Sequence, residues 1–422
     1  MSPRYVLVLA YYFPPLGGSG VQRVAKLVKY LPTFGWKPTV LTATPGAYVA
    51  FDQALAEEVA AAGVEVSATR TLDPTRTGQG RVVSATGSAR SGLRALTDWL
   101  LVPDNKIGWA PFALRRGAQL LRQPAFDAVY VTAPPYTCLL VGARLARQFG
   151  LPLLVDLRDD WLGNPRHHYP TRWHRALHAR LERQVLRQAA GVSVISVAMR
   201  RAVVERHPEA RVRVVPQGFD PADFDPAREP IRDGVFRLLY SGMFYDAQRP
   251  DSFLEGLRRF LASRPEARVE ATFAGLVPPQ FDALVSRMGL SEVVRYEGYL
   301  SHAEVTRRQQ QADVLWMTVG RRPGAEGIST GKLFEYFGTR RPIVGLVPEG
   351  TAAEALRAYG AGYVVDPDDA PAVAETLATL YESWQAGTLP VPDETFVRRH
   401  DRRQLAGEVA EWLSEVVEGH SE

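Results

Sequence analysis

Short apolar runs alternate with amphipathic stretches through the first half of the chain. The first run is Tyr5–Ala10, and the stretch after it places Val21, Val24, Ala25, Val28 and Leu31 on one face at helical spacing. Further strand-like runs are Thr39–Thr42, Ala128–Val131, Pro152–Asp156, Val192–Ile195 and Val212–Val215. This alternation is typical of βαβ units around a parallel sheet.

A second series of the same kind follows a segment rich in Pro and Asp, Gln217–Gly234, which we interpret as an interdomain connection. Its apolar runs are Phe236–Ser241, Val269–Ala274, Val293–Tyr296, Val314–Met317, Pro342–Leu346 and Tyr363–Val365. The sequence therefore predicts an α/β protein with two doubly wound, Rossmann-like parallel-sheet domains facing an interdomain cleft. Ligands of such sheets bind beyond the carboxyl ends of the strands.

Composition narrows the class of protein. The chain has 422 residues, enough for two domains, and its net charge is only +4 with both signs mixed, which disfavours a nucleic-acid partner. The single cysteine, Cys138, fits a reducing compartment, and no apolar run is long enough to span a membrane. We expect a cytoplasmic protein. Peripheral contact with the inner face of a membrane is possible where the aromatic stretch Trp99–Leu121 carries Arg115 and Arg116.

Two glycine-rich loops are candidate phosphate sites. The first, PPLGGSG, places Gly17 and Gly18 between a predicted strand and helix, where backbone N–H groups can approach a phosphate. A tight structural turn is the alternative. The glycine spacing does not fit the Rossmann dinucleotide fingerprint GxGxxG.

The second loop lies within Gly324–Gly345 and leads into a helix that we expect to begin near Gly331. Its N–H groups, the hydroxyls of Ser329 and Thr330 and the Lys332 ammonium can surround a diphosphate. Lysine in a first helical turn runs against the helix dipole, as functional residues often do. Glu335, one turn later, can accept hydrogen bonds from ribose hydroxyls. The alternative is an exposed lysine after a capping loop. A P-loop is disfavoured because Leu333 follows the lysine.

Charged residues follow two other predicted strands. Arg158 and Asp159 lie in VDLRDDW, and Asp159 is our candidate proton acceptor or sugar contact, with a surface salt-bridge cluster as the alternative. We do not expect a metal there, because no further acid or histidine cluster supports one. Arg249 follows the first strand of the second series and can neutralise charge on a leaving diphosphate, or else is a solvated surface residue.

Taken in order, these motifs resemble family 4 of the retaining glycosyltransferases (glycosyl transferases group 1), which have the GT-B fold. The likeness is to polysaccharide-biosynthesis members that open with a YYFPPLGGSGVQR-like motif. The matching segments are Tyr11–Arg23, Asp156–Trp161, Val215–Asp220 and Ser329–Ile343. The resemblance implies an N-terminal acceptor-side domain (1–218), to which the final helix (400–422) returns, and a C-terminal nucleotide-sugar-binding domain (219–399).

The resemblance also implies roles for single residues. Gly17 and Gly18 would approach the donor phosphate, Arg249 and Lys332 would hold the diphosphate, and Glu335 would hold the ribose. Gly327 occupies the position of the family's first Glu, Met243 stands where a basic residue is frequent, and Thr132 is the nearest substitute for an active-site His.

The implied reaction is transfer from a UDP- or GDP-sugar to a hydroxyl acceptor, without metal or other cofactor and with retention of configuration. Retention is explained by attack on the face that the leaving diphosphate vacates, with that diphosphate helping to take the proton. The acceptor implied is a glycan or a lipid-linked glycan. A small-molecule acceptor, and a non-catalytic protein that binds sugar nucleotides, remain the alternatives.

Overall fold

The computed structural model describes residues 3–46, 48, 51–73, 99–123, 126–164, 167, 169–244, 248–328 and 330–421. The chain folds into two compact units. The first unit comprises Met1–Gln217 and Arg402–Glu422, and the second comprises Gly218–Asp401. Among the described residues, no helix is both long and apolar enough to cross a membrane.

The first unit contains a seven-stranded parallel sheet in the order β3-β2-β1-β4-β5-β6-β7. Its strands are β1 (Arg4–Leu9), β2 (Trp36–Ala43), β3 (Glu65–Thr69), β4 (Ala128–Ala133), β5 (Leu153–Leu157), β6 (Gly191–Val194) and β7 (Val212–Val214). The central strands β4 and β5 are buried along their whole length, as parallel strands covered on both faces must be.

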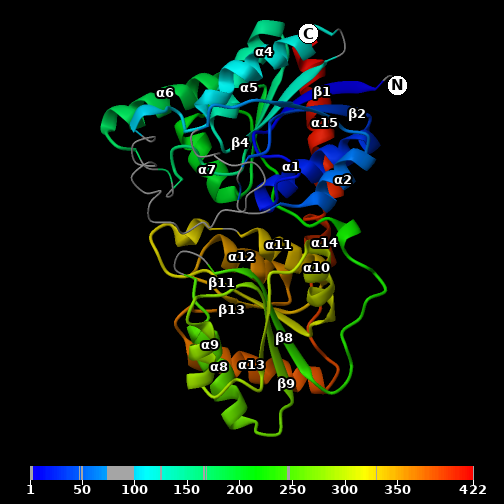
Figure 1. The fold of residues 1–422 in the computed structure, drawn as a ribbon, viewed down its shortest axis with the longest axis vertical. Helices are drawn as coiled ribbons and strands as arrows, with labels where there is room; N and C mark the ends of the chain where they lie inside the picture. The colour runs from blue at the N-terminus through cyan, green and yellow to red at the C-terminus, as the bar shows by residue number, and fades with distance from the viewer. Residues whose placement is uncertain are drawn as a thin grey trace. The chain divides into compact units, whose positions relative to one another are not determined.

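Helices cover both faces of this sheet (Figure 1). One face packs against α4 (Ala110–Leu121), α5 (Thr137–Phe149), α6 (Arg172–Gln188) and α7 (Val197–Arg206). The other packs against α1 (Ser19–Tyr30), α2 (Gln53–Ala61) and α15 (Arg402–Ser421). The fully buried Leu413 and the nearly buried Trp412 anchor α15, the last helix of the chain, in the core of the first unit.

The second unit contains a six-stranded parallel sheet in the order β10-β9-β8-β11-β12-β13. Its strands are β8 (Phe236–Met243), β9 (Val269–Leu276), β10 (Val294–Gly298), β11 (Val314–Thr318), β12 (Ile343–Leu346) and β13 (Gly362–Val365). The helices are α8 (Asp251–Ser263), α9 (Phe281–Arg287), α10 (His302–Gln311), α11 (Gly331–Thr339), α12 (Thr351–Tyr359), α13 (Ala370–Gln385) and α14 (Glu394–Arg398). The core between α8, α9, α13 and the sheet is distinct from the core on the opposite face, which contains α11 and α12.

The predicted fold class is confirmed as two Rossmann-like parallel sheets, and every predicted strand is present within a few residues. One strand, β3, was not predicted. It lies at the edge of the first sheet, where only Ser67 is buried, so its sequence EVSAT lacks the apolar run by which a central strand is recognised.

Candidate functional site

The strand order of the second sheet places the segments that follow β8 and β11 at the same edge of the sheet. Strand order reverses between β8 and β11, which are hydrogen-bonded neighbours at the centre of the sheet. Arg249 follows β8, and the loop that leads into α11 follows β11. In open parallel sheets the crevice at such a switch point is where ligands bind. The second unit therefore contains a candidate ligand site at the carboxyl ends of β8 and β11.

The loop before α11 presents polar groups with few protein partners. Thr330 is the N-cap residue of α11, but its side chain makes no capping hydrogen bond. Its hydroxyl oxygen is buried and has no hydrogen-bond partner among the described residues. The helix itself begins at Gly331, as predicted, and its first turn contains no acid. A buried hydroxyl next to unpaired helix N–H groups is suited to an anion. Ser329 lies outside the described residues.

Lys332 lies in the first turn of α11 and turns its ammonium towards the end of β8. Its Nζ donates a hydrogen bond of 2.6 Å to the Tyr240 hydroxyl and lies 3.9 Å from the centre of the Tyr240 ring. Among the described residues no carboxylate lies within ion-pair distance of Nζ. Burial lowers the pKa of Lys332 to about 7, and the opposing effect of Glu335 is smaller. A cation held this way is available to a ligand anion.

Gly242 has no side chain, and the Lys332 ammonium lies in the space that a side chain there would take. Its φ of +123 favours glycine, and a Cβ there would lie 3.0 Å from the Lys332 Nζ. Gly275 lies at the end of the adjacent strand β9 and is even closer to Gly242, because a Cβ at Gly275 would lie 2.0 Å from the Gly242 carbonyl oxygen. Larger side chains at either position would displace the strand ends or the lysine.

A hydrogen-bond network fixes α11 to β8. The Tyr336 hydroxyl accepts a 2.8 Å hydrogen bond from the Ser241 backbone N–H, and Gln309 donates a 2.9 Å hydrogen bond to the Ser241 hydroxyl. Tyr240 and Tyr336 were not predicted as site residues. The only signal in the sequence was that Tyr336 lies four residues after Lys332, which places both residues on the same face of a helix.

Arg249 is exposed and lines a surface cavity of about 260 Å³. Asp251, Gln280 and Arg287 contribute the other polar groups of this cavity. Glu335 is half-buried one turn after Lys332, and its contact with a ribose stays a prediction. Gly327 faces open space, with no atom within 4 Å of the position that a Cβ would take. A ligand can therefore approach the Gly327 backbone.

In the first unit, Gly18 is the residue before α1 and has φ +97, a conformation that favours glycine. Gly17 is buried and Gly18 is exposed. A Cβ at Gly20 would lie 2.2 Å from a guanidinium nitrogen of Arg158, so this loop and Arg158 are in close contact. The Arg158 guanidinium also donates to the Ala133 carbonyl oxygen at 3.3 Å. Arg158 thereby joins the start of α1 to the ends of β4 and β5.

The carboxylates that follow β5 have different surroundings. Asp156 is buried and accepts 2.8 Å hydrogen bonds from Arg23, Thr132 and Ser193. Burial alone would raise the pKa of Asp156, but the Arg23 charge and these hydrogen bonds outweigh it, and the pKa lies below its ordinary value. Asp159, in contrast, is exposed.

Two of the acceptor-side candidates therefore differ in their structural setting. The Thr132 hydroxyl is buried and directed at Asp156 within the strand layer, which is a structural contact. Asp159 is accessible at the end of β5, where an acceptor hydroxyl can reach it. The roles of both residues remain predictions.

The fold and the loop before α11 define a two-unit α/β protein with a candidate anion site in the second unit. Residues 18–218 match the model of the glycosyl transferase 4-like domain, and residues 235–383 match that of the glycosyl transferases group 1. The chain belongs to this glycosyltransferase family and is a glycosyltransferase. The predicted family, the glycosyl transferases group 1, is thus confirmed, whereas retention and a role in polysaccharide biosynthesis stay predictions. No curated protein sequence matches the chain.

Solved structures share the fold over nearly the whole chain. HepE of Anabaena, solved in complex with UDP and glucose, is 18% identical with a TM-score of 0.59, covering 98% of this chain and 100% of that one. A glycosyltransferase from Rickettsia africae is 13% identical with a TM-score of 0.64, covering 99% of each chain. The trehalose 6-phosphate synthase of Burkholderia multivorans is 16% identical with a TM-score of 0.60, covering 100% of this chain and 98% of that one.

Proposed function

We propose that this glycosyltransferase moves a sugar from a UDP- or GDP-sugar to a hydroxyl of a glycan or lipid-linked glycan, with retention and without a metal ion. The assignment of a nucleotide-sugar donor rests on Lys332, a cation with no carboxylate in ion-pair distance among the described residues. The nearby Thr330 hydroxyl also has no hydrogen-bond partner among these residues. HepE, which shares the fold, was solved with UDP-glucose, and this supports a uridine nucleotide as the first donor to test.

The chemistry follows from charge. Cleavage of the bond between sugar and diphosphate leaves negative charge on the diphosphate, and groups that stabilise this charge accelerate the reaction. We assign this stabilisation to the Lys332 ammonium, the Arg249 guanidinium and the N–H groups of Thr330 and Gly331. Glu335 would hold the ribose hydroxyls. These cationic groups supply the role for which many phosphoryl-transfer sites use a metal.

On the acceptor side, the proposal assigns Asp159 and Arg158 to the acceptor hydroxyl. The hydroxyl would attack the anomeric carbon from the face that the diphosphate leaves, and its proton would pass to a diphosphate oxygen. The new glycosidic bond then has the configuration of the donor. A small-molecule acceptor fits the same residues, and only an acceptor screen separates it from a glycan.

A thermal-shift screen of UDP, GDP and ADP and of their sugars tests the donor. A ligand present at about 100 times its Kd stabilises the folded state by about 2.7 kcal/mol. We expect a shift with a uridine or guanosine nucleotide and none with ADP. If neither a uridine nor a guanosine nucleotide stabilises the protein, the donor assignment is wrong.

Two further measurements test the finer parts of the proposal. A proton NMR spectrum recorded early in the reaction reports the anomeric configuration of the transferred sugar, which must equal that of the donor. Activity must also persist after dialysis against EDTA. An inverted product would exclude retention, and loss of activity that Mg²⁺ or Mn²⁺ restores would exclude a metal-independent mechanism.

A further inference from the structure

Three helices of the first unit carry positive charge almost exclusively. Helices α4, α5 and α6 lie on the same face of the sheet (Figure 1). There are two arginines in α4, two in α5 and five in α6, with no lysine or aspartate and one glutamate, Glu182. The face covered by α15 differs, since the exposed part of that helix contains Glu411, Glu415 and Glu418. Helices α4, α5 and α6 therefore differ in charge from α15.

The one glutamate does not reduce the charge of the exposed surface. Glu182 is fully buried, and its carboxylate oxygens pair with Arg206 and His207 at 3.2 Å each. The arginines of α6 are exposed. Within the described part of the chain, Arg187 alone among them has a carboxylate partner, Glu209. Both side chains of that pair are largely in solvent, where the interaction is weak.

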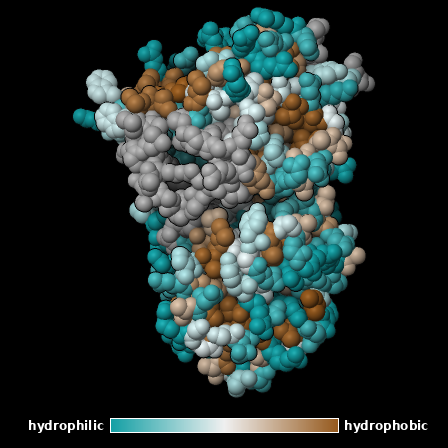
Figure 2. Space-filling view, in the orientation of Figure 1, coloured by the Kyte–Doolittle hydropathy of each residue, from teal (hydrophilic) through white to brown (hydrophobic). Residues whose placement is uncertain are grey.

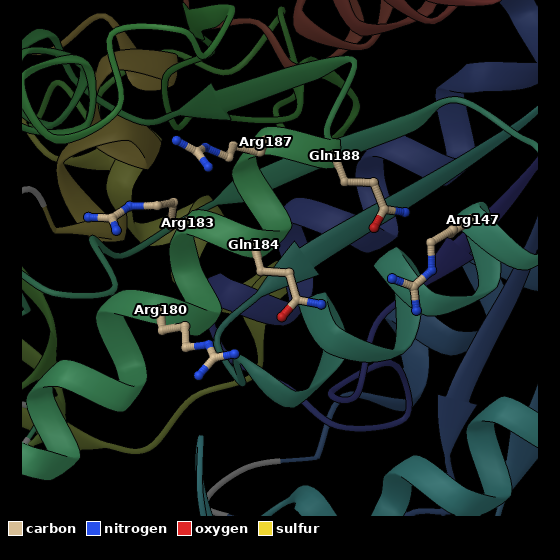
Figure 3. A pocket seen from close by; sticks show the side chains of 6 residues that line it. All are labelled: Arg147, Arg180, Arg183, Gln184, Arg187 and Gln188. Atoms are coloured by element: carbon tan, nitrogen blue, oxygen red, sulfur yellow. The ribbon is translucent and has the colours of Figure 1, made fainter.

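A cavity of about 460 Å³ opens beside α5 and α6. Its lining consists only of arginine and glutamine: Arg147, Arg180, Arg183, Gln184, Arg187 and Gln188. Figure 3 shows Arg180 and Gln184 extending from α6 on the side of Arg147, which comes from α5, while Arg183 and Arg187 extend from the other side of α6. Among the described residues, Arg147, Arg180 and Arg183 have no ion-pair partner. Arg147 and Arg180 therefore lie on one side of α6, and guanidinium groups placed side by side fit phosphate oxygens.

Large apolar side chains are exposed on the same helix. Trp173 is 85% exposed and Leu177, one turn later, is 43% exposed. Trp99 is 54% exposed and lies edge-on against His174 of α6, at 5.1 Å between ring centres. Figure 2 shows hydrophobic and hydrophilic residues side by side in the region where Figure 1 draws α6. Arginine combined with exposed Trp and Leu is the composition of helices that lie in a membrane interface.

We propose that the exposed face of α5 and α6 docks on an anionic phospholipid bilayer, with lipid phosphates in the arginine cavity and Trp173, Leu177 and Trp99 among the headgroups. Charge complementarity selects this occupant, and the exposed tryptophans favour lipid over a purely ionic partner. The docking itself is a property of this face. Its purpose, access to a lipid-linked acceptor, rests on the proposed function.

Co-sedimentation of the full chain with vesicles tests the proposal. One set of vesicles is phosphatidylcholine, and the other contains about 30 mol% phosphatidylglycerol, a fraction that gives the negative surface on which basic residues act. The charge variant is the triple substitution Arg147→Gln, Arg180→Gln and Arg183→Gln. Its matched control removes the same charge from exposed arginines of the second unit, Arg268→Gln, Arg295→Gln and Arg398→Gln.

We expect binding to the anionic vesicles only, weakened by high salt. The charge variant should bind about 100-fold more weakly, since each basic residue near such a surface contributes roughly a factor of five. The control triple should lose less than about threefold of its affinity, because its arginines lie outside this face. Equal binding to both vesicle types, or equal losses in both triples, would overturn the proposal.

A second variant distinguishes a membrane from another polyanion. Trp173→Ser with Leu177→Ser should weaken vesicle binding by about 10-fold or more and leave heparin binding unchanged, because only lipid receives these side chains. If the variant binds vesicles like the wild type, the face is a general polyanion site and the membrane proposal fails. The UDP thermal shift is measured in parallel. If the wild type shows no thermal shift with UDP or GDP but binds anionic vesicles, only the donor proposal is contradicted. If the wild type shows the shift but does not bind anionic vesicles, only the docking surface is contradicted.

Discussion

The two units differ in whether a charged side chain at a strand end has a counter-ion in the protein. At the end of β5 in the first unit, Asp156 forms a two-point contact with Arg23, with N–O distances of 2.8 and 3.2 Å, and accepts two further hydrogen bonds. At the end of β8 in the second unit, the Lys332 ammonium donates to a tyrosine hydroxyl and lies over its ring, and no carboxylate among the described residues pairs with it. The neighbouring Thr330 hydroxyl has no partner among the described residues.

This difference separates structural charge from charge held for a ligand. A buried ion whose hydrogen bonds are all made within the protein has nothing left to offer a ligand, and its removal destabilises the fold because its partner stays buried and unpaired. A buried cation without a counter-ion destabilises the ligand-free protein and gains most when an anion arrives. We therefore expect substitutions at Asp156 to affect stability and substitutions at Lys332 to affect donor chemistry.

The largest effect should follow Asp156→Ala. The substitution leaves the Arg23 guanidinium buried without its counter-ion, which typically costs 3–5 kcal/mol, or about 4 kcal/mol here. Urea denaturation of the full chain measures the loss. The control is Glu205→Ala, an exposed residue whose substitution should change the free energy of unfolding by less than about 0.5 kcal/mol. Because the folded pKa of Asp156 is lowered, its contribution is present above the ordinary pKa of about 3.9 and is lost as the pH falls through the folded value.

Lys332→Ala should reduce kcat/KM for the donor by about 100-fold or more, or about 2.7 kcal/mol, since it removes charge stabilisation of the leaving diphosphate. Stability of the ligand-free protein should be unchanged or higher. The matched control is Lys37→Ala, an exposed lysine whose Nζ lies 5.7 Å from the Tyr5 ring centre in the first unit. Donor kinetics within a few-fold of the wild type would contradict the role of Lys332.

Arg249→Ala tests the second cation of the proposed site. We expect a loss of about 100-fold in kcat/KM, for the same electrostatic reason. Arg287→Ala is the control, because Arg287 is exposed and lines the same cavity without a proposed contact to the diphosphate. Equal small effects of both substitutions would show that Arg249 is a solvated surface residue.

The affinity for UDP should fall as the pH rises above about 7. In the ligand-free protein Lys332 loses its proton near this pH, whereas a bound diphosphate favours the charged ammonium, so binding takes up a proton. We expect the Kd to rise about tenfold per pH unit, until the pH reaches the higher pKa of the complex. Titration calorimetry in buffers of different ionisation enthalpy measures the proton uptake. A Kd that does not change between pH 7 and about pH 8.5 would refute this coupling.

The smallest effect is expected for Thr330→Val. The substitution removes a buried hydroxyl that has no partner among the described residues, so the stability of the ligand-free protein should not fall. UDP affinity should fall about fivefold, equivalent to about 1 kcal/mol for one hydrogen bond. Thr330→Ser keeps the hydroxyl and should retain the affinity. Equal affinities for the Val variant and the wild type would exclude a contact between Thr330 and the donor.

Local pattern was sufficient to predict much of this molecule. The alternation of apolar runs and amphipathic stretches predicted two parallel sheets, because buried parallel strands must be apolar along their length, as β4 and β5 are. The start of α11 at Gly331 followed from a glycine-rich loop before an apolar helical face. The order of the motifs indicated the family. The edge strand β3 was missed because it is mostly exposed and has no such run.

The pairing of charges was decided only by the tertiary structure. In the sequence, Asp156 and Asp159 are near neighbours, of which Asp159 was the predicted proton acceptor or sugar contact, and Thr132 was the nearest substitute for a histidine. The register of β4 and β5 pairs Thr132 with Asp156, and helix α1 brings Arg23 to the same carboxylate. Likewise, Tyr240 meets Lys332 only because β8 and α11 pack together. Electrostatic energy depends on distance and burial, which the fold sets between residues far apart in the chain.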